Sequence, residues 1–198
     1  MKITMIILIS ILSLLAVAQI LISKNTRNTE QHKYVVLKKF DKFEVRKYEA
    51  AIFSSVKLNV DSYKETSGMG FRILAGYIFG DNESNEKIAM TTPVAMEIGD
   101  SSKMSFMVPK DMNVDKLPKP NNKDIIFEKH NEKIMAAIQF DGWADDEKIE
   151  YYKSILIDEL SKQNLAHYHK FSFLGYNPPF DLVDRRNEVV VELIDFKD

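Results

Sequence analysis

Two histidines stand out in this 198-residue chain because their type and spacing could support metal chemistry. His167 and His169 are two residues apart, so on a strand both imidazoles would point to the same side and could ligate a metal ion. No third ligand is evident beside them, and a solvated strand end is the simpler interpretation. His32 falls in a polar segment and His130 at a predicted surface turn. The histidines therefore predict no metal site.

The sequence contains no arrangement of side chains that catalysis would require. Cysteine is absent, which excludes disulfides, thiolate catalysis, zinc–thiolate sites and iron–sulfur clusters. No serine occupies a nucleophile elbow. The run Gly68-Met69-Gly70 lies inside a predicted helix, whereas a phosphate-binding loop follows a strand. Acidic runs such as 145–147 are interpreted as solvated helix charges. We therefore expect a protein that is not an enzyme.

Two adjacent arginines, Arg185 and Arg186, lie in a late loop (residues 175–187) that also carries a stiff aromatic turn at 176–180. Arginine pairs bidentately with carboxylates, so two guanidinium groups beside an apolar pocket would suit a flat apolar ligand with acidic side arms. The alternative is a surface network in which the arginines pair with neighbouring acids and hold the loop in place. On the residues alone, that network is the simpler interpretation.

The stretch from residue 77 to 94 connects the elements that would position such a pocket. Gly80-Asp81-Asn82 breaks a predicted helix, because glycine tolerates a left-handed cap and Asp and Asn favour turns. Apolar residues then alternate from Ile88 onward, as on a strand with one buried face. Pro93 cannot donate to a sheet ladder, so it predicts an edge, a bulge or a bend. A bend beside a helix end can form a pocket, although a plain helix-to-strand connection explains the same residues.

Hydrophobic periodicity predicts the same order of elements twice, namely strands, a helix and two further strands. The first half has strands at 34–40, 43–48 and 50–58, a helix capped by Asp61 or Ser62 that runs to 79, and strands at 88–98 and 103–108. After a proline-containing linker at 109–123, the second half has a hairpin of 125–130 and 133–140, a helix at 146–163 capped by Asp145, and strands at 168–174 and 188–194. We therefore expect an α+β fold in which two pseudo-repeated halves form a distorted antiparallel β-barrel of about eight strands, flanked by two main helices.

Gly68 and Gly70 fall within the first of these two helices. Each weakens a helix by about 1 kcal/mol relative to alanine. Their presence indicates either that another element packs close to the helix backbone or that the first turn is frayed, and the sequence leaves both interpretations open.

The N-terminal segment is a hydrophobic run that is almost uninterrupted from residue 3 to 22, about long enough to cross a bilayer as a helix. Lys2 supplies a short positive region, and Ala16-Val17-Ala18 fits a cleavage site. The apolar run continues beyond that site, so a removed signal peptide and an uncleaved anchor both remain open. We expect a signal peptide or anchor at 1–23, a polar tether at 24–33 and a folded domain at 34–198, in a membrane-anchored or exported protein.

Composition restricts the remaining possibilities. The 45% hydrophobic content is sufficient for one core, and the net charge of -2 is unlike that of a nucleic-acid-binding protein, which needs a basic stripe. We therefore expect no nucleic-acid partner, membrane association through the N-terminal segment, and a monomer.

Several motifs, in order from about residue 34 to 194, resemble those of the SOUL haem-binding protein family. They are Phe43-Glu44-Val45-Arg46-Lys47-Tyr48, Tyr77-Ile78-Phe79-Gly80 with Asn82, Lys87-Ile88-Ala89-Met90-Thr91-Thr92-Pro93-Val94, Leu117-Pro118-Lys119-Pro120, Phe140-Asp141-Gly142, Tyr176-Asn177-Pro178-Pro179 and Arg185-Arg186-Asn187-Glu188-Val189. The resemblance implies non-covalent binding of haem or another tetrapyrrole by a carrier, buffer or sensor. The implied site is a shallow apolar groove between the first predicted helix of the folded domain and the late loop.

The residues that the resemblance implies for this groove come from three segments. They are Phe71, Leu74, Ala75 and Ile78 from the helix, Met90 beneath it, and Phe180, Leu182, Arg185 and Arg186 from the late loop. Some family members carry a histidine where this chain has Lys47, so axial ligation from that position is excluded. The resemblance then implies reversible binding through apolar contact and propionate pairing, with no axial ligand identified.

Three other functions remain open at the level of sequence. The first is an effector-binding domain for other flat, amphipathic small molecules, since domains of related architecture bind varied lipophilic cations. An acidic residue in the pocket, for example Glu188 or Glu97, would favour a cation. A tetrapyrrole-modifying enzyme ranks lower because no catalytic constellation is present. A groove of this kind could also bind a peptide.

Overall fold

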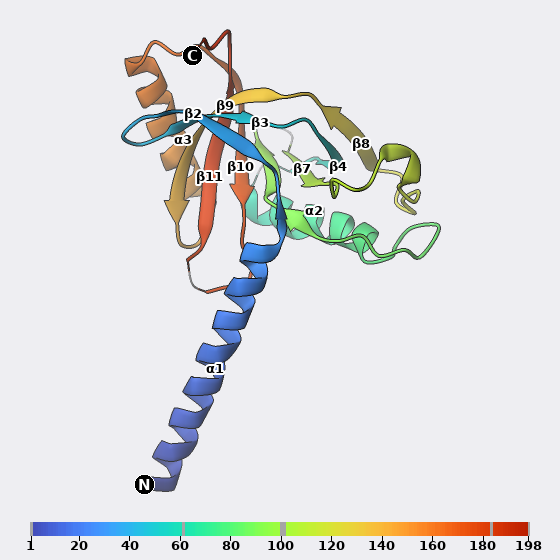
Figure 1. The fold of residues 1–198 in the computed structure, drawn as a ribbon, viewed down its shortest axis with the longest axis vertical. Coiled ribbons are helices and arrows are strands. Elements are labelled where there is room, and N and C mark those ends of the chain that lie inside the picture. The colour runs from blue at the N-terminus through green and yellow to red at the C-terminus, as the bar shows by residue number, and fades with distance from the viewer. Residues whose placement is uncertain (1, 61, 100–101, 183, 198) are drawn as a thin grey trace.

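A curled antiparallel sheet dominates the computed structural model of the chain, which describes residues 2–60, 62–99, 102–182 and 184–197. A long apolar helix projects from one end of this folded part (Figure 1). The described residues form an α+β fold with a nine-stranded half-barrel sheet and two helices packed on it, so the predicted fold class is confirmed.

The nine strands follow one another in the sheet in the order β2-β3-β9-β11-β10-β6-β7-β4-β8. Their bounds are β2 Tyr34–Lys39, β3 Glu44–Tyr48, β4 Ala51–Leu58, β6 Val94–Ile98, β7 Ser102–Met107, β8 Ile125–His130, β9 Lys133–Asp141, β10 His167–Gly175 and β11 Arg186–Leu193. Two short strands, β1 Glu30–Gln31 and β5 Thr91–Thr92, pair in parallel outside this sheet. A 3-10 turn, η1 (Val114–Lys116), lies in the linker between the halves.

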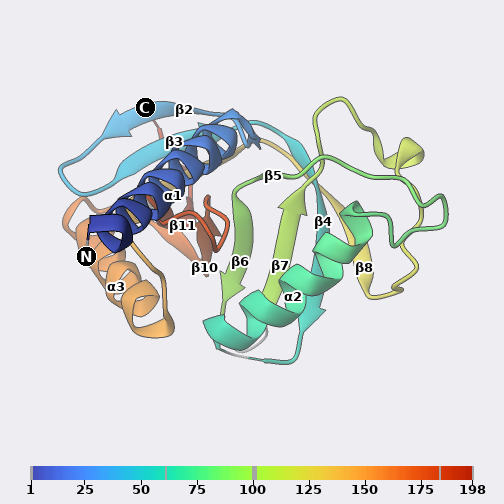
Figure 2. The same cartoon turned by 90° about the horizontal axis from the view of Figure 1, so that it is seen from below.

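One long two-stranded ribbon curls the sheet. β3 and β4 are consecutive in the chain, and they pair antiparallel with β9 and β8 respectively. Tyr48 lies opposite Lys133 at the end of β3. Three residues further along the chain, Ala51 lies opposite His130 at the start of β4, so the register does not change across the break. The ribbon therefore joins both ends of the sheet, and the sheet bends into the half-barrel seen in Figure 2.

The predicted hairpin between residues 125–130 and 133–140 is wrong. β8 pairs with β4 at an edge of the sheet, whereas β9 lies between β3 and β11. The two residues Asn131 and Glu132 continue a bent strand and do not reverse it. An alternating pattern indicates which face of a strand is buried but not which strand lies beside it, and the prediction failed for this reason.

The single strand expected over residues 88–98 is two short strands in the structure. β5 covers Thr91 and Thr92, and β6 begins at Val94, so Pro93 separates them. This is the interruption that a proline predicts, because it has no N–H for the ladder. Ile88 is buried before β5 without being part of a strand.

Two helices cover one face of the sheet (Figure 2). α2 (Tyr63–Ile78) packs on β4 and β7, and α3 (Asp146–Lys162) packs on β9 and β11. Ser62 caps α2 by accepting a hydrogen bond from the backbone of Glu65, while Asp61 lies outside the described residues. The two helices begin side by side, since the backbone N–H of Tyr63 donates to the carboxylate of Asp146.

The two glycines of α2 have different surroundings. A Cβ built on Gly70 would lie 2.9 Å from Cβ of Met104 and 3.1 Å from Cδ1 of Leu58, whereas one on Gly68 would meet nothing within 4 Å. Close packing against the helix backbone therefore explains Gly70 but not Gly68.

The N-terminal helix α1 extends from Lys2 to Asn28. Its stretch Thr4–Lys24 is long and apolar enough to span a membrane, and none of its most apolar window is buried against the rest of the chain. The expected irregular tether is helical up to Asn28, because no glycine or proline ends the helix there. The division of the chain at residues 23 and 33 stays a prediction.

Candidate functional site

The predicted groove residues of α2 lie mostly on its inner face. Leu74, Ala75 and Ile78 are buried in the core, with exposed fractions of 7% or less. Phe71 is 38% exposed, and its ring centroid lies 5.4 Å from that of Phe106 on β7. Helical spacing selects a shared face, and here that face packs mainly on the sheet. Of these four residues, Phe71 is the one that reaches the surface.

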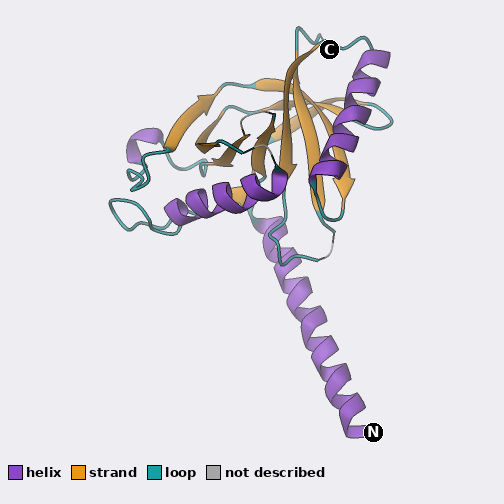
Figure 3. Cartoon of the chain, turned by 180° about the vertical axis from the view of Figure 1, so that it is seen from behind, coloured by secondary structure: helices purple, strands orange, loops and turns teal. Residues whose placement is uncertain are grey.

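The apolar residues predicted from the late loop are exposed. The structure gives this loop the bounds 176–185, between β10 and β11, and it lies at the end of the domain from which α1 projects (Figure 3). Phe180 and Leu182 have exposed fractions of 60% and 61%. Met90 is half-buried against the core in the segment before β5. Phe71, Phe180 and Leu182 are therefore the predicted apolar residues that a ligand can contact without rearrangement of the core.

Arg185 organises the late loop from within. Its Nη1 donates to the carbonyl oxygens of Pro178 at 2.9 Å and Asp181 at 2.7 Å. The guanidinium carbon also lies 4.0 Å from the ring centroid of Trp143, in a cation–π contact. Partial burial lowers the pKa of Arg185 from its ordinary value. These contacts occupy the guanidinium group and stabilise the conformation of the loop.

Arg186 points to the opposite side of the sheet. Its Nε and Nη2 donate to Oε1 of Glu188 at 3.0 and 2.7 Å, and its Nη2 also donates to the hydroxyl of Tyr34 at 2.9 Å. The guanidinium lies 4.0 Å from the ring centroid of Tyr176. The two arginines are therefore not brought together, because successive side chains of an extended segment leave on opposite faces.

Glu188 lies at the centre of a buried polar cluster on this face of the sheet, which the helices do not cover. It is fully buried and accepts hydrogen bonds from Arg46 Nη1 at 2.8 Å and from the hydroxyl of Tyr176 at 3.0 Å, in addition to those from Arg186. Burial, followed by the charge of Glu188, raises the pKa of Tyr176 well above its ordinary value. Burial likewise raises the pKa of Tyr48, the neighbour of Arg46, to about 12. The surface network expected around the arginines is thus in part a buried one.

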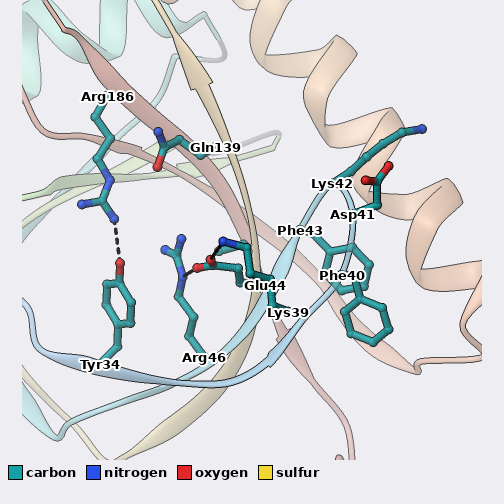
Figure 4. A pocket seen from close by; sticks show the side chains of 11 residues that line it. Tyr34, Lys39, Phe40, Asp41, Lys42, Phe43, Glu44, Arg46, Gln139 and Arg186 are labelled. Atoms are coloured by element: carbon teal, nitrogen blue, oxygen red, sulfur yellow. Dashed lines mark hydrogen bonds and ion pairs between the residues drawn. The ribbon is translucent and has the colours of Figure 1, made fainter.

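A cavity of about 300 Å³ opens beside this cluster (Figure 4). Charged and polar side chains dominate its walls, among them Tyr34, Lys39, Glu44, Arg46 and Arg186. Figure 4 shows the guanidinium groups turned toward partners within the protein. The cavity could admit water or a small anion, but its volume is at the lower limit of sites for drug-sized ligands.

A second cavity, of about 220 Å³, lies near β1 and contains His32 in its wall. The Nε2 atom of His32 lies 2.8 Å from the carbonyl oxygen of Glu49, and its ring packs against Tyr48 and Phe53. The ring of His130 also packs against Phe53, with the ring centroids 4.8 Å apart. Both histidines are less exposed than the sequence predicts. Nothing local indicates this, because their neighbours come from distant strands.

The remaining histidines do not form a metal site in the described part of the chain. The ring centroids of His167 and His169 lie 5.4 Å apart. Within the described ranges, no group of three or more histidine, aspartate or glutamate side chains is arranged to hold an ion.

Comparison with known proteins relates the chain to one family. A family model described as "SOUL heme-binding protein" matches residues 29–192. The chain is 30% identical over 156 residues to "Heme-binding protein 2" of Mus musculus, covering 74% of this chain and 76% of that protein. It is 27% identical over 155 residues to "Heme-binding protein 1" of Xenopus laevis, covering 74% and 81%. The crystal structure of the EcmrR C-terminal domain has a similar fold, with a TM-score of 0.60 and 11% identity over 78% of this chain and 98% of that chain.

Proposed function

The chain belongs to the SOUL heme-binding protein family, and from this premise we propose that it binds haem or a related tetrapyrrole non-covalently and reversibly, as a carrier, buffer or sensor. The family match carries this proposal, because residues 29–192 include the whole curled sheet except its last residue, both packed helices and the late loop. The relatives named above are called heme-binding proteins.

We propose that the ligand binds on the apolar surface of α2 and the late loop. Phe71, Phe180 and Leu182 expose large apolar side chains there, and an exposed apolar patch is a common sign of a binding surface. Leu74, Ala75, Ile78 and Met90 would support this surface from behind. The 300 Å³ cavity suits a tetrapyrrole less well, because its polar walls do not match the flat apolar body of the ligand.

For the carboxylate arms of the ligand we propose Arg72 as the partner. It is exposed on α2 beside Phe71, and within the described residues it forms no ion pair. Arg185 and Arg186 already donate to the loop and to Glu188, so either would have to break these bonds first. None of the four histidines belongs to α2 or the late loop. Binding then depends on apolar contact and charge, which favours reversible exchange.

A flat cation as the ligand has less support. The two acids that would attract a cation already form ion pairs. Glu188 pairs with Arg46 and Arg186. Glu97 lies 3.0 Å from Nζ of Lys103. A cation at Glu188 would have to displace a guanidinium group from a buried site.

We further propose that α1 anchors the protein in a membrane. Its apolar stretch is uncovered by the rest of the chain, and a bilayer would remove this surface from water. The hydrophobic core contains no described residue of α1, so a chain that starts at Thr29 should fold without it.

Titration of residues 29–198 with hemin tests the function. We expect a saturable shift of the Soret band, with affinity about tenfold weaker when Phe180→Ser and Leu182→Ser are combined, because about 1.4 kcal/mol of apolar contact is lost. Tyr151→Ser is the matched control, since Tyr151 is also 60% exposed but lies on α3. No absorbance change at micromolar hemin would reject binding, and equal affinity of the two variants would reject this surface.

A further inference from the structure

Among the described residues, the side chain of Gln19 on the apolar helix α1 binds the late loop. Nε2 of Gln19 donates to the carbonyl oxygen of Phe180 at 3.1 Å, and the backbone N–H of Leu182 donates to Oε1 of Gln19 at 3.1 Å. Gln19 lies inside the candidate span, five residues before its end at Lys24. At about 1.5 Å per residue, this places the loop tip roughly 7 Å inside the apolar stretch. A bilayer around α1 would therefore reach the loop.

Five polar backbone groups of the loop tip have hydrogen-bond partners within the described part of the protein. Arg185 binds the carbonyls of Pro178 and Asp181, Gln19 binds the backbone on either side of Asp181, and the N–H of Asp181 donates to the carbonyl of Pro178. The prolines at 178 and 179 have no N–H to satisfy. The carboxylate of Asp181 is buried and accepts from Nδ2 of Asn177 at 2.9 Å. Irregular backbone can enter an apolar medium only when its polar groups are paired in this way.

The side chains at the loop tip match a lipid surface. Phe180 and Leu182 expose large apolar side chains there, next to the exposed Pro179 and Asp184, and Trp143 has an exposed fraction of 54%. The contact between Trp143 and Arg185 fixes its place next to the loop. Tryptophan favours the boundary between headgroups and acyl chains. α2 lies along the same end of the domain, beside the origin of α1 (Figures 1 and 3).

We propose that the late loop enters the membrane that α1 spans, with Phe180 and Leu182 among the acyl chains and Trp143 at the headgroups. The partner of this surface is thus a lipid bilayer. The inference rests on α1 as a membrane anchor. It also deepens the proposed function, because the ligand surface of α2 and the late loop would then face the lipid and an apolar tetrapyrrole could exchange with the bilayer directly.

The single tryptophan of the chain allows a direct test. The full chain is reconstituted into phosphatidylcholine vesicles, with and without bromine atoms near the headgroup end of the acyl chains. We expect the fluorescence of Trp143 to be quenched by the brominated lipid. Alkaline carbonate extraction of the same vesicles shows whether the chain is anchored. If the chain stays in the membrane but the fluorescence of Trp143 is not quenched, the inference is overturned and the anchor is retained. Release of the chain by carbonate would overturn both.

Variants separate lipid contact from tetrapyrrole binding. The chain has no cysteine, so Phe180→Cys and Tyr151→Cys each provide one site for an environment-sensitive dye. We expect a blue-shifted emission on vesicles at position 180 and no shift at position 151, and equal emission at both would also reject the inference. Hemin titration of residues 29–198 needs no lipid, so a failure there concerns the proposed function and not the membrane contact.

Discussion

Arg46 and Glu188, which are 142 residues apart in the chain, form a buried ion pair with 2.8 Å between Nη1 and Oε2. Their side chains are 4% and 0% exposed. The pair joins β3 to β11 across the intervening strand β9, on the face that the helices do not cover. Glu188 on β11 is therefore bonded to Arg46 on β3, to Arg186 at the start of β11 and to Tyr176 just after β10, and it is not a free acid at the wall of a binding site.

Removal of Glu188 should destabilise the fold strongly. Glu188→Ala leaves the buried Arg46 and the partly buried Arg186 without their shared partner, and breaking a buried pair on one side typically costs about 3–5 kcal/mol. Denaturant unfolding of residues 29–198 measures this change. The control is Glu132→Ala, which breaks the exposed pair with Lys47 and should cost less than about 1 kcal/mol. Equal losses in the two variants would contradict the prediction.

Mild acid should weaken the fold through two histidines. Burial lowers the pKa of both His32 and His130 below the ordinary value of 6.5. The unfolded chain therefore binds protons near this pH that the folded chain does not, and the free energy of unfolding falls as the pH drops below about 6.5. Urea unfolding at about pH 7.5 and about pH 5.5 measures the loss. The double variant His32→Gln, His130→Gln should lose less between these two pH values, and an unchanged loss would count against the assignment.

The two glycines of α2 should respond in opposite directions to alanine. Gly68→Ala should stabilise the protein by about 0.5–1 kcal/mol, because alanine is the better helix former and its Cβ meets open space. Gly70→Ala should cost about 1–3 kcal/mol, since its Cβ would press on Met104. Thermal unfolding of both variants under identical conditions provides the comparison. Changes of the same sign would show that the backbone of α2 does not pack on β7 as described.

The N-terminal helix should be retained in the mature protein. The hydrogen bonds of Gln19 to the late loop give α1 a role next to the folded domain, whereas a removed signal peptide would need none. Intact mass of the protein purified from membranes measures this directly, and we expect the mass of a chain that still contains residues 16–28. A mass that corresponds to a chain starting at Gln19 would show that residues 1–18 are removed, and it would exclude the anchor.

Hydrophobic alternation and helix capping predicted the elements, and both depend on residues that are close together in the chain. Apolar alternation placed β2, β3 and β4 within about one residue of their observed bounds, and Ser62 and Asp145 cap the helices that they were expected to cap. The family resemblance assigned Leu74, Ala75 and Ile78 to the ligand groove, and this assignment stays a prediction. The structure buries all three on the face of α2 that packs on the sheet, and a motif match does not decide which face of a helix the core covers.

Long-range contacts decided what periodicity could not. The same alternation is compatible with β8 beside β9 or beside β4, and the continuous register of the long ribbon selects the second. Arg185 and Arg186 are adjacent in the sequence, which suggested a shared binding site. Their side chains point to opposite sides of the chain and have different partners. His32 acquires its partly buried environment from aromatic rings on β3 and β4.

The sequence by itself determined the fold class, the family and an apolar N-terminal segment, because each depends on patterns within short windows or on motifs in a fixed order. Only the tertiary structure decided that Glu188 is paired with arginine side chains inside the sheet and that Gln19 reaches the late loop. Both contacts join residues more than 140 positions apart, and no local pattern specifies where two such distant segments meet.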